Sequence, residues 1–429
     1  MSRASRLSLK QWIKRPLDQW PLLQGCVRCL YALIRFLVPT HSRRILFESS
    51  PDCADNSLAL YEAIQRSPRA SEYQLVWLVK NVDGAAQELK REFGTVAPNT
   101  RIVWKGSIGG VIELLRSRYV FYTHSCYWFA RSCFHQKMVY LGHGIPIKTM
   151  GALLAKSGVV FRSRQYSLAT SPALAPIIAS TFGTVPELIL VSGFPRNEWM
   201  TCPDEAITRL KGDRNLVVWL PTFRSSGTDG VADDTLPGAP GPLDDLASLD
   251  QRLRGKNVLV VIKFHPLDTN NARQWPAFEN IKIYSDRAFR DSRLNLYKLL
   301  GHASALVTDY SSVAIDFLSL RRPIGIFAPD QSSYIRGFMP QVIDHVSAVC
   351  RRLNTIEELA NFISAPPPLD APAESLEFLH SKGLNAPSQT ILAAFGLDDL
   401  LLPASETASL HVVPLGEARE ASLAARGRA

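Results

Sequence analysis

Short apolar runs alternate with amphipathic stretches along most of the chain. The first series of runs lies at residues 45–48, 75–79, 101–104, 119–122, 138–141, 167–169 and 188–191. A second series follows Pro203, at residues 216–220, 258–263, 281–284, 305–308 and 324–327. Amphipathic stretches lie between the runs, for example at residues 108–115, 173–182, 243–253, 294–300 and 313–320. Strands separated by helices in this way predict an α/β protein with mostly parallel sheets and helices on both faces.

The restart of the pattern predicts two doubly wound, Rossmann-like domains that face a cleft. We place the first domain at residues 44–202 and the second at residues 203–365. Residues 225–242, which are rich in Gly, Pro, Ser and Asp, predict a long mobile loop. Three prolines from Pro366 open a linker and C-terminal helix at residues 366–403, and residues 404–429 are predicted to form a flexible tail.

Composition and charge narrow the class of protein. The chain has 429 residues, of which 46% are hydrophobic and 20% charged, which excludes a disordered or disulfide-stapled chain. Of the net charge of +9, residues 1–44 carry +8 and all the rest carry +1. A nucleic-acid-binding protein would spread its basic residues over a folded face, so nucleic acid is disfavoured as a partner. Seven scattered cysteines favour a reducing compartment.

The basic segment at residues 1–43 suggests a membrane surface. Trp12 and Trp20 lie near Lys10, Lys14 and Arg15. Such a helix can lie in the interface, with cations on anionic headgroups, so we predict that residues 1–40 bind an anionic membrane surface. The alternative is a first helix packed on the domain with a solvated basic face. No uncharged apolar run of about 18 residues is present, which argues against a spanning helix.

Polar residues collect where the predicted strands end, which is the edge where open α/β sheets bind ligands. After the run at 138–141, His143 lies between Gly142 and Gly144, and Lys148 follows a turn later. Glycines on both sides of a histidine allow a ligand to approach the backbone closely. The alternative is a turn histidine that is satisfied by its own backbone.

The second series ends in cations. Arg224 follows the run at 216–220 and suits a bidentate contact with phosphate, although a surface ion pair is an equal alternative. The run at 258–263 ends in Lys263, and His265 shares its face through the two-residue period of a strand.

Hydroxyl groups and carboxylates mark the end of the run at 305–308. Thr308 and Asp309 are followed by Ser311 and Ser312 at the start of a predicted helix, where free N–H groups and the helix dipole can bind phosphate. Asp316, four residues after Ser312, shares a helix face with it. Simple N-capping by serine is the alternative. The sequence has no Asp-x-Asp motif and no phosphate-binding Gly-x-x-x-x-Gly-Lys loop, so we predict no metal and no cofactor.

Four ordered motifs resemble the CDP-glycerol glycerophosphotransferase family, which includes teichoic-acid primases and polymerases and related capsule enzymes. They are His143-Gly-Ile-Pro-Ile-Lys148, Pro221-Thr-Phe-Arg224, Lys263-Phe-His-Pro266 and Thr308-Asp-Tyr-Ser-Ser312 with Asp316. The resemblance implies a GT-B-like fold and a peripheral membrane enzyme on the cytoplasmic side of the bacterial plasma membrane.

The resemblance also implies roles for the site residues. The enzyme would move glycerol phosphate, or a related polyol phosphate, from CDP-glycerol to a hydroxyl of a lipid-linked or polymeric cell-envelope acceptor, and release CMP. Residues 44–202 would bind the acceptor and residues 203–365 the nucleotide donor. His143 would be the general base, and His265 would contact or protonate the diphosphate. Arg224, Ser311 and Ser312 would also contact phosphate, and Asp316 would help to hold the nucleotide or its own serine-rich turn. The predicted substrate-binding residues further include Gly144, Lys148, Lys263, Thr308 and Asp309.

Two competing functions fit parts of the sequence. A GT-B glycosyltransferase that uses a nucleotide sugar would have the same cleft and a similar acceptor. A non-catalytic scaffold that binds polymer or membrane is a third possibility, and the pair of strand-end histidines speaks against it.

Overall fold

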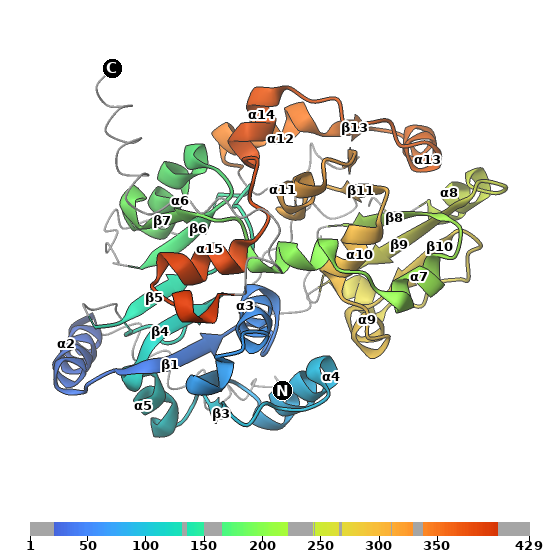
Figure 1. The fold of residues 1–429 in the computed structure, drawn as a ribbon. Helices are drawn as coiled ribbons and strands as arrows, with labels where there is room; N and C mark the ends of the chain where they lie inside the picture. The colour runs from blue at the N-terminus through green and yellow to red at the C-terminus, as the bar shows by residue number, and fades with distance from the viewer. Residues whose placement is uncertain are drawn as a thin grey trace, which may run out of the picture. The chain divides into compact units, whose positions relative to one another are not determined.

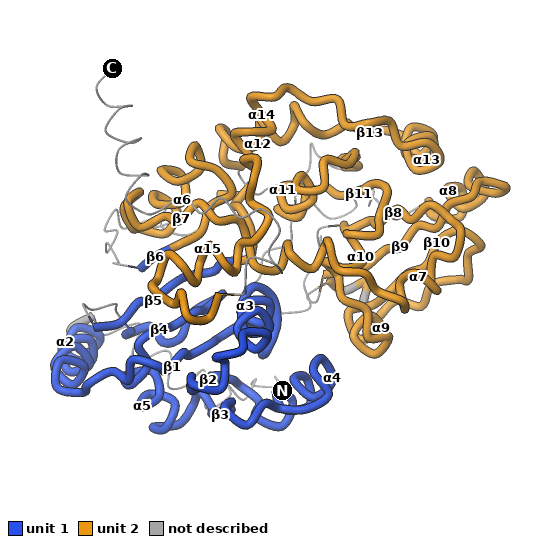
Figure 2. The backbone as a smooth tube through the Cα atoms, viewed as in Figure 1, with its two compact units in different colours: residues 1–142, 162–166 blue, residues 143–161, 167–429 orange. Residues whose placement is uncertain are grey.

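The computed structural model describes residues 21–130, 135–149, 165–221, 243, 245–265, 268–309, 311–328 and 338–401. These residues form two compact units, shown in separate colours in Figure 2. The first unit comprises residues 1–142 and 162–166, and the second comprises residues 143–161 and 167–429. The segment that begins at His143 therefore belongs to the second unit, as do all the other predicted site residues.

The first sheet has the strand order β3-β2-β1-β4-β5-β6-β7, and its strands run parallel from β3 to β5 and again in the pair β6-β7. Its strands are β1 (His41–Glu48), β2 (Gln74–Val79), β3 (Thr100–Trp104), β4 (Ser117–Tyr122), β5 (Lys137–Tyr140), β6 (Tyr166–Ala169) and β7 (Ile189–Val191). The first unit holds β1 to β5, and these strands alternate along the chain with α2 (Pro21–Leu37), α3 (Asp55–Gln65), α4 (Val82–Phe93) and α5 (Ile108–Arg116). A short 3₁₀ helix, η1, lies at Ala70–Glu72. The strand order reverses between β1 and β4.

The core of the first unit explains why these strands are apolar runs. β1 lies between β2 and β4, with Ile45 opposite both Leu75 and Tyr119. Because both faces of a parallel sheet are covered, almost every residue of such a strand is buried. Ile45, Leu75 and Val120 have no exposed surface.

The second sheet lies entirely in the second unit and has the parallel order β10-β9-β8-β11-β12-β13. Its strands are β8 (Asn215–Leu220), β9 (Val258–Lys263), β10 (Ile281–Tyr284), β11 (Ala305–Thr308), β12 (Ile324–Phe327) and β13 (Arg351–Leu353). This is the doubly wound order of Rossmann-like sheets, and it reverses between β8 and β11. A ligand site is therefore expected beyond the carboxyl ends of these two strands.

Helices surround this second sheet and the end of the first (Figure 1). The α-helices of the second unit are α6 (Ala175–Phe182), α7 (Glu205–Lys211), α8 (Leu246–Arg252), α9 (Asp286–Asp291), α10 (Leu296–His302), α11 (Val313–Phe317), α12 (Pro340–Val349), α13 (Ile356–Ser364), α14 (Ala373–Leu379) and α15 (Pro387–Ala394). Short 3₁₀ helices are η3 (Pro172–Leu174), η4 (Pro186–Leu188), η5 (Pro195–Thr201), η6 (Thr269–Ala272), η7 (Leu318–Leu320) and η9 (Asp398–Leu400). Apolar residues of α8 and α13 pack with those of β8 and β9 in one core, which includes Leu249, Leu359 and Val260.

Every predicted strand is present, and the bounds agree to within two residues except at the start of β1, which begins at His41. The sequence prediction missed β13, because its Arg351-Arg352-Leu353 lacks an apolar run. The predicted linker and single C-terminal helix contain α14 and α15 instead. The predicted loop at 225–242 and tail at 404–429 lie outside the described residues. Within the described ranges, we find no helix with the length and apolar character needed to span a membrane.

Candidate active site

The turn after β5 carries the predicted catalytic histidine. His143 is half-buried and lies between two glycines in left-handed backbone conformations, Gly142 at φ +64° and Gly144 at φ +114°. Such conformations favour glycine, which explains the Gly-His-Gly sequence. The Asn56 side chain donates to the carbonyl groups of Leu141 and Gly142 at 3.2 and 2.9 Å, which fixes the backbone as it enters the turn.

Arg196 contacts this turn. One nitrogen of its guanidinium, Nη2, lies 2.6 Å from the His143 carbonyl oxygen and 2.7 Å from Oδ2 of Asp316. Asp316 is fully buried on α11, and Tyr297 on α10 donates its hydroxyl to the same carboxylate at 3.0 Å. Asn197 approaches the other carboxylate oxygen at 3.4 Å. The cation of Arg196 also lies 4.7 Å from the centre of the Tyr297 ring.

We call Arg196, Asn197, Tyr297 and Asp316 the arginine node. It joins η5, α10 and α11 to the turn that carries His143. A buried carboxylate is stable only when it is paired and hydrogen-bonded, and the three donors of the node meet this need. Through Arg196, these contacts link Asp316 to the turn that carries His143. The two roles predicted for Asp316, toward the nucleotide or toward its own serine-rich turn, stay predictions.

One of the two predicted serines, Ser312, adjoins the same turn. Ser311 and Ser312 precede α11, and both are half-buried. A Cβ atom built on Gly144 would lie 2.9 Å from Oγ of Ser312 and 3.0 Å from Nη2 of Arg196. The structure therefore brings together His143, Gly144, Ser312 and Asp316, whose motifs are far apart in the sequence.

The Lys263 side chain has a partner that the strand-end pattern did not predict. Its ammonium group lies 3.2 Å from Oδ1 of Asp286 and donates to the Phe264 carbonyl at 3.0 Å. Burial lowers the pKa of Lys263, and the Asp286 carboxylate opposes this effect. His265, two residues further on, is exposed, and its carbonyl accepts from the Asp268 amide at 2.9 Å. Lys263 is thus engaged in an ion pair, whereas the imidazole of His265 lies at the surface.

The remaining predicted residues have different surroundings. Thr308 is fully buried and donates its hydroxyl to the Leu220 carbonyl at 2.8 Å, so it fastens the ends of β11 and β8. Asp309 is buried directly after this strand. Lys148 is half-buried, and its backbone forms an isolated antiparallel bridge with Phe338. Arg224 lies outside the described residues.

Charged residues also lie at the carboxyl edge of the first sheet. Glu48 ends β1, almost completely buried, and Nζ of Lys105 lies 2.7 Å from its Oε1. Burial raises the pKa of Glu48, and the charge of Lys105 opposes this effect. The sequence prediction assigns no role to this pair, although it stands at the end of a buried strand.

The sequence prediction found the arginine node only in part. Arg196 and Asn197 follow Gly193-Phe194-Pro195 directly after β7, so the rule that polar residues collect at strand ends would have found them. Tyr297 gives no such signal, because it lies within the first turn of a helix.

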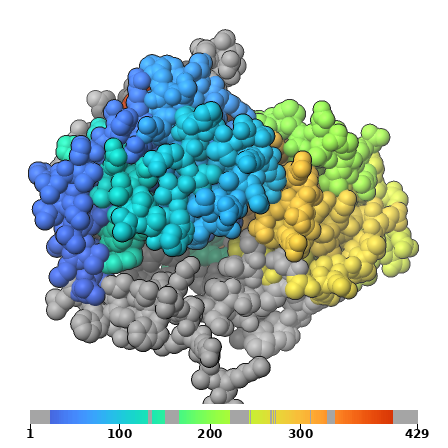
Figure 3. All heavy atoms as spheres, turned by 90° about the horizontal axis from the view of Figure 1, so that it is seen from below, coloured from blue at the N-terminus to red at the C-terminus, as the bar shows by residue number. Residues whose placement is uncertain are grey.

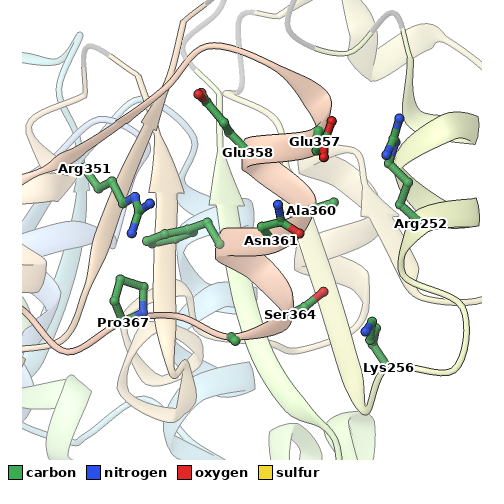
Figure 4. Close-up of a pocket in the computed structure, with 11 residues that line it drawn as sticks. Arg252, Lys256, Arg351, Glu357, Glu358, Ala360, Asn361, Ser364 and Pro367 are labelled. Carbon is green, nitrogen blue, oxygen red and sulfur yellow. The ribbon is translucent and has the colours of Figure 1, made fainter.

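A hollow of about 650 Å³ lies elsewhere in the second unit, between α8 and α13 (Figure 4). Arg351 opens β13 and Lys256 precedes β9, so the hollow adjoins the amino ends of these strands. The predicted residues follow the carboxyl ends, so the hollow is separate from the candidate site. Nowhere in the described part of the chain do three or more His, Cys, Asp or Glu side chains form a group that could hold a metal ion.

Comparison with known proteins identifies the family. The model of the CDP-Glycerol:Poly(glycerophosphate) glycerophosphotransferase family matches residues 30–366. The chain belongs to this family. The match confirms the predicted family and enzyme class, a glycerophosphotransferase, and it weighs against a nucleotide-sugar glycosyltransferase or a scaffold.

Individual relatives agree with this membership. A teichoic acid ribitol-phosphate primase of Bacillus spizizenii is 31% identical over 187 residues, which are 41% of this chain and 44% of the relative. A teichoic acid glycerol-phosphate transferase of Staphylococcus aureus is 23% identical over 77% of this chain and 89% of its own. The solved structure of the wall teichoic acid polymerase TagF has a TM-score of 0.65 at 20% identity, and covers 94% of this chain and 100% of that one. The likeness confirms the predicted α/β, GT-B-like fold.

Proposed function

We propose that this glycerophosphotransferase moves glycerol phosphate from CDP-glycerol to a hydroxyl group of a lipid-linked or polymeric cell-envelope acceptor and releases CMP. The observation that carries the proposal is the approach of the His143 turn to Ser312 and the arginine node. A histidine on a turn that approaches Ser312 offers a base, and the serine hydroxyl offers a hydrogen-bond donor, for a phosphoryl group.

The reaction is a displacement at the phosphorus that bears glycerol. The acceptor oxygen attacks this phosphorus, and its proton passes to the imidazole of His143. The bond between the phosphorus and the bridging oxygen breaks, and CMP leaves with that oxygen. Positive groups and N–H donors around the phosphoryl oxygens stabilise the charge that develops there. We assign this task to Ser311, Ser312, Lys148 and Arg224, and contact with the leaving phosphate to His265.

A donor screen tests the reaction. The full chain is incubated with membrane acceptor and with CDP-glycerol, CDP-ribitol or a UDP-sugar, and the released nucleotide is measured. We expect CMP from CDP-glycerol. Release of CMP from CDP-ribitol alone would assign a ribitol donor, a donor class suggested by the ribitol-phosphate primase among the relatives. Release of UDP alone would contradict the proposal.

The role of His143 as base makes a separate prediction. His143→Ala should lower turnover by about 10²–10⁴-fold, because a positioned base contributes that much, while CDP-glycerol still binds. His135, which is exposed, offers a matched control: His135→Ala should leave turnover unchanged. Loss of donor binding in step with turnover would contradict the assignment of His143 as base.

We also propose that the enzyme binds the cytoplasmic face of the plasma membrane through α2. Tyr31 and Arg35 of this helix are buried, and their side chains are hydrogen-bonded at 3.1 Å. The opposite side of the helix exposes apolar residues, among them Leu33 at 60% and Phe36 at 80%. Figure 3 shows α2, in dark blue, at the surface of its unit. Of the two interpretations of this segment, packing on the domain applies to Tyr31 and Arg35, and a lipid surface suits the apolar side.

Vesicle sedimentation tests the membrane proposal. The double variant Leu33→Glu with Phe36→Glu should weaken binding to vesicles that contain phosphatidylglycerol. Val82→Glu, at an exposed apolar residue of α4, is the matched control and should bind as the wild type does. If the double variant sediments with vesicles to the same extent as the control, α2 is not the lipid-binding surface. Deletion of residues 1–20 measures the contribution of the basic segment separately.

Finally, we propose that the reaction needs no metal ion. The support is the set of side chains assigned to phosphate, in which cations and hydroxyl groups perform the neutralising role that a metal performs in other phosphoryl transferases. Turnover should survive EDTA. Loss of activity with the chelator and recovery with Mg²⁺ would contradict this proposal.

A further inference from the structure

The side chain of Arg196, in the arginine node, donates to the main-chain carbonyl group of His143. This contact suggests a role for Arg196 in catalysis, which rests on the proposed function. We propose that Arg196 is a positioning residue that fixes the imidazole of His143 by holding the carbonyl group of the same residue. In this proposal Arg196 touches neither the donor nor the acceptor. It acts on catalysis only through the place and orientation of His143.

The turn needs such a contact because of its sequence. Gly142 and Gly144 flank His143, and glycine has more backbone freedom than any other residue. Without further contacts, rotation about these two residues would move the imidazole relative to its substrate. A misplacement of about 1 Å can lower turnover by about 10²-fold.

Three consecutive carbonyl groups in the turn accept a side-chain hydrogen bond. Asn56 donates to those of Leu141 and Gly142, and Arg196 donates to that of His143 at 2.6 Å. The His143 carbonyl is thus held by a charged donor, and hydrogen bonds from charged groups are the stronger kind. This hydrogen bond fixes the peptide plane next to the Cα atom of His143, from which the imidazole side chain extends.

The position of Arg196 is in turn determined by its surroundings. Its side chain is only 6% exposed, and Nη2 lies 2.7 Å from Oδ2 of Asp316, which is itself fully buried. Tyr297 donates to that same oxygen and places its ring 4.7 Å from the guanidinium carbon. A planar guanidinium between a carboxylate and an aromatic face is more strictly oriented than a lysine would be. Lysine is therefore a poor substitute.

Kinetics separate positioning from substrate binding. Arg196→Gln should lower the turnover number by about 10²-fold and leave the KM for CDP-glycerol within about twofold. Tyr297→Phe keeps both charges and should lower turnover by about fivefold, which provides a second variant if Arg196→Gln folds poorly. The matched control is Arg209, an exposed residue of the same unit that pairs with Glu205. Arg209→Gln should have the turnover number and the KM of the wild type. A rise in KM equal to the fall in turnover would show that Arg196 binds the donor and would overturn the proposal.

A double-mutant cycle tests whether Arg196 acts through His143. In the His143→Ala background there is no imidazole to place, so Arg196→Gln should cause no further loss of the residual turnover. If the double variant instead loses turnover by the product of the two single losses, Arg196 acts independently of His143, and the proposal is overturned.

Hydrogen exchange provides a measurement that does not depend on turnover. Arg196→Gln should speed exchange of the amides of residues 142–149, and Arg209→Gln should not. Unchanged exchange would overturn the positioning role even if the donor screen succeeds. Faster exchange together with a failed donor screen would support positioning and refute only the proposed reaction.

Discussion

Gly144→Ala tests the close packing of the turn that carries His143 with the least chemical change. The substitution adds one methyl group where φ is +114°, a conformation that alanine rarely adopts. Such strain costs about 1–3 kcal/mol. The new Cβ would lie 2.9 Å from Oγ and 3.3 Å from Cβ of Ser312, and 3.0 Å from Nη2 of Arg196. Because two hydrogen bonds hold Nη2, the turn itself must move.

We therefore expect Gly144→Ala to lower the free energy of unfolding by about 2 kcal/mol and turnover by about 10²-fold. Urea denaturation measures the first quantity and CMP release the second. Gly255 is the matched control, because its φ is +70° and nothing lies within 4 Å of a Cβ built there. Gly255→Ala should cost about 1 kcal/mol and leave turnover unchanged. If the two variants have equal stability and equal turnover, the close packing around Gly144 has no catalytic importance.

Three further variants test individual assignments. Burial lowers the pKa of His380, and the negative charge of Asp316 opposes this effect. As the pH falls, His380 is therefore protonated in the unfolded chain at a higher pH than in the folded protein, which favours the unfolded chain. The free energy of unfolding, measured with urea, should decrease as the pH is lowered beneath about 6.5, and His380→Gln should make this decrease smaller. A variant with the same pH profile as the wild type would contradict the assignment to His380. Asp286→Asn leaves the buried ammonium of Lys263 without its carboxylate and should cost about 3 kcal/mol in urea denaturation; a loss below about 1 kcal/mol would show that this pair is unimportant. Thr308→Val should lower the free energy of unfolding by about 1–2 kcal/mol and leave the KM for the donor unchanged, whereas a raised KM would support the substrate-binding role predicted for Thr308.

The fold could be predicted from the sequence because buried parallel strands have a strong local signal. The run at 258–263, for example, is apolar up to Lys263 and coincides with β9. The weak strand β13 has two arginines in three residues and lacks such a signal. The direction of the chain then places His143, Ser312 and His265 after strand ends, which is all that a local pattern can establish.

Hydrogen bonds and ion pairs between residues far apart in the sequence were harder to predict from the local pattern. Lys263 is predicted to bind substrate, and the structure adds an ion pair between its ammonium group and Asp286, which the local pattern did not predict. This partner follows from the sheet: β9 and β10 are adjacent and parallel, Lys263 lies opposite Tyr284, and Asp286 comes two residues later. The same reasoning applies to Thr308, which lies opposite Leu220 and donates to its carbonyl. The register of neighbouring strands, which a local pattern does not give, therefore determines which protein partner a polar side chain at a strand end meets.

The arginine node raises the question of why a buried ion pair contacts the turn that carries His143. Apolar residues of similar volume often stabilise a protein core as well as a buried pair or better, so stability alone does not explain it. An apolar pair would lack a donor for the His143 carbonyl, which receives its hydrogen bond from Arg196. The carboxylate of Asp316 is then required, because an arginine with no counter-charge at this depth would cost more than the hydrogen bond contributes. The pair is therefore best explained by the need to orient the peptide group of His143. On this explanation, the protein gives up some stability and gains turnover.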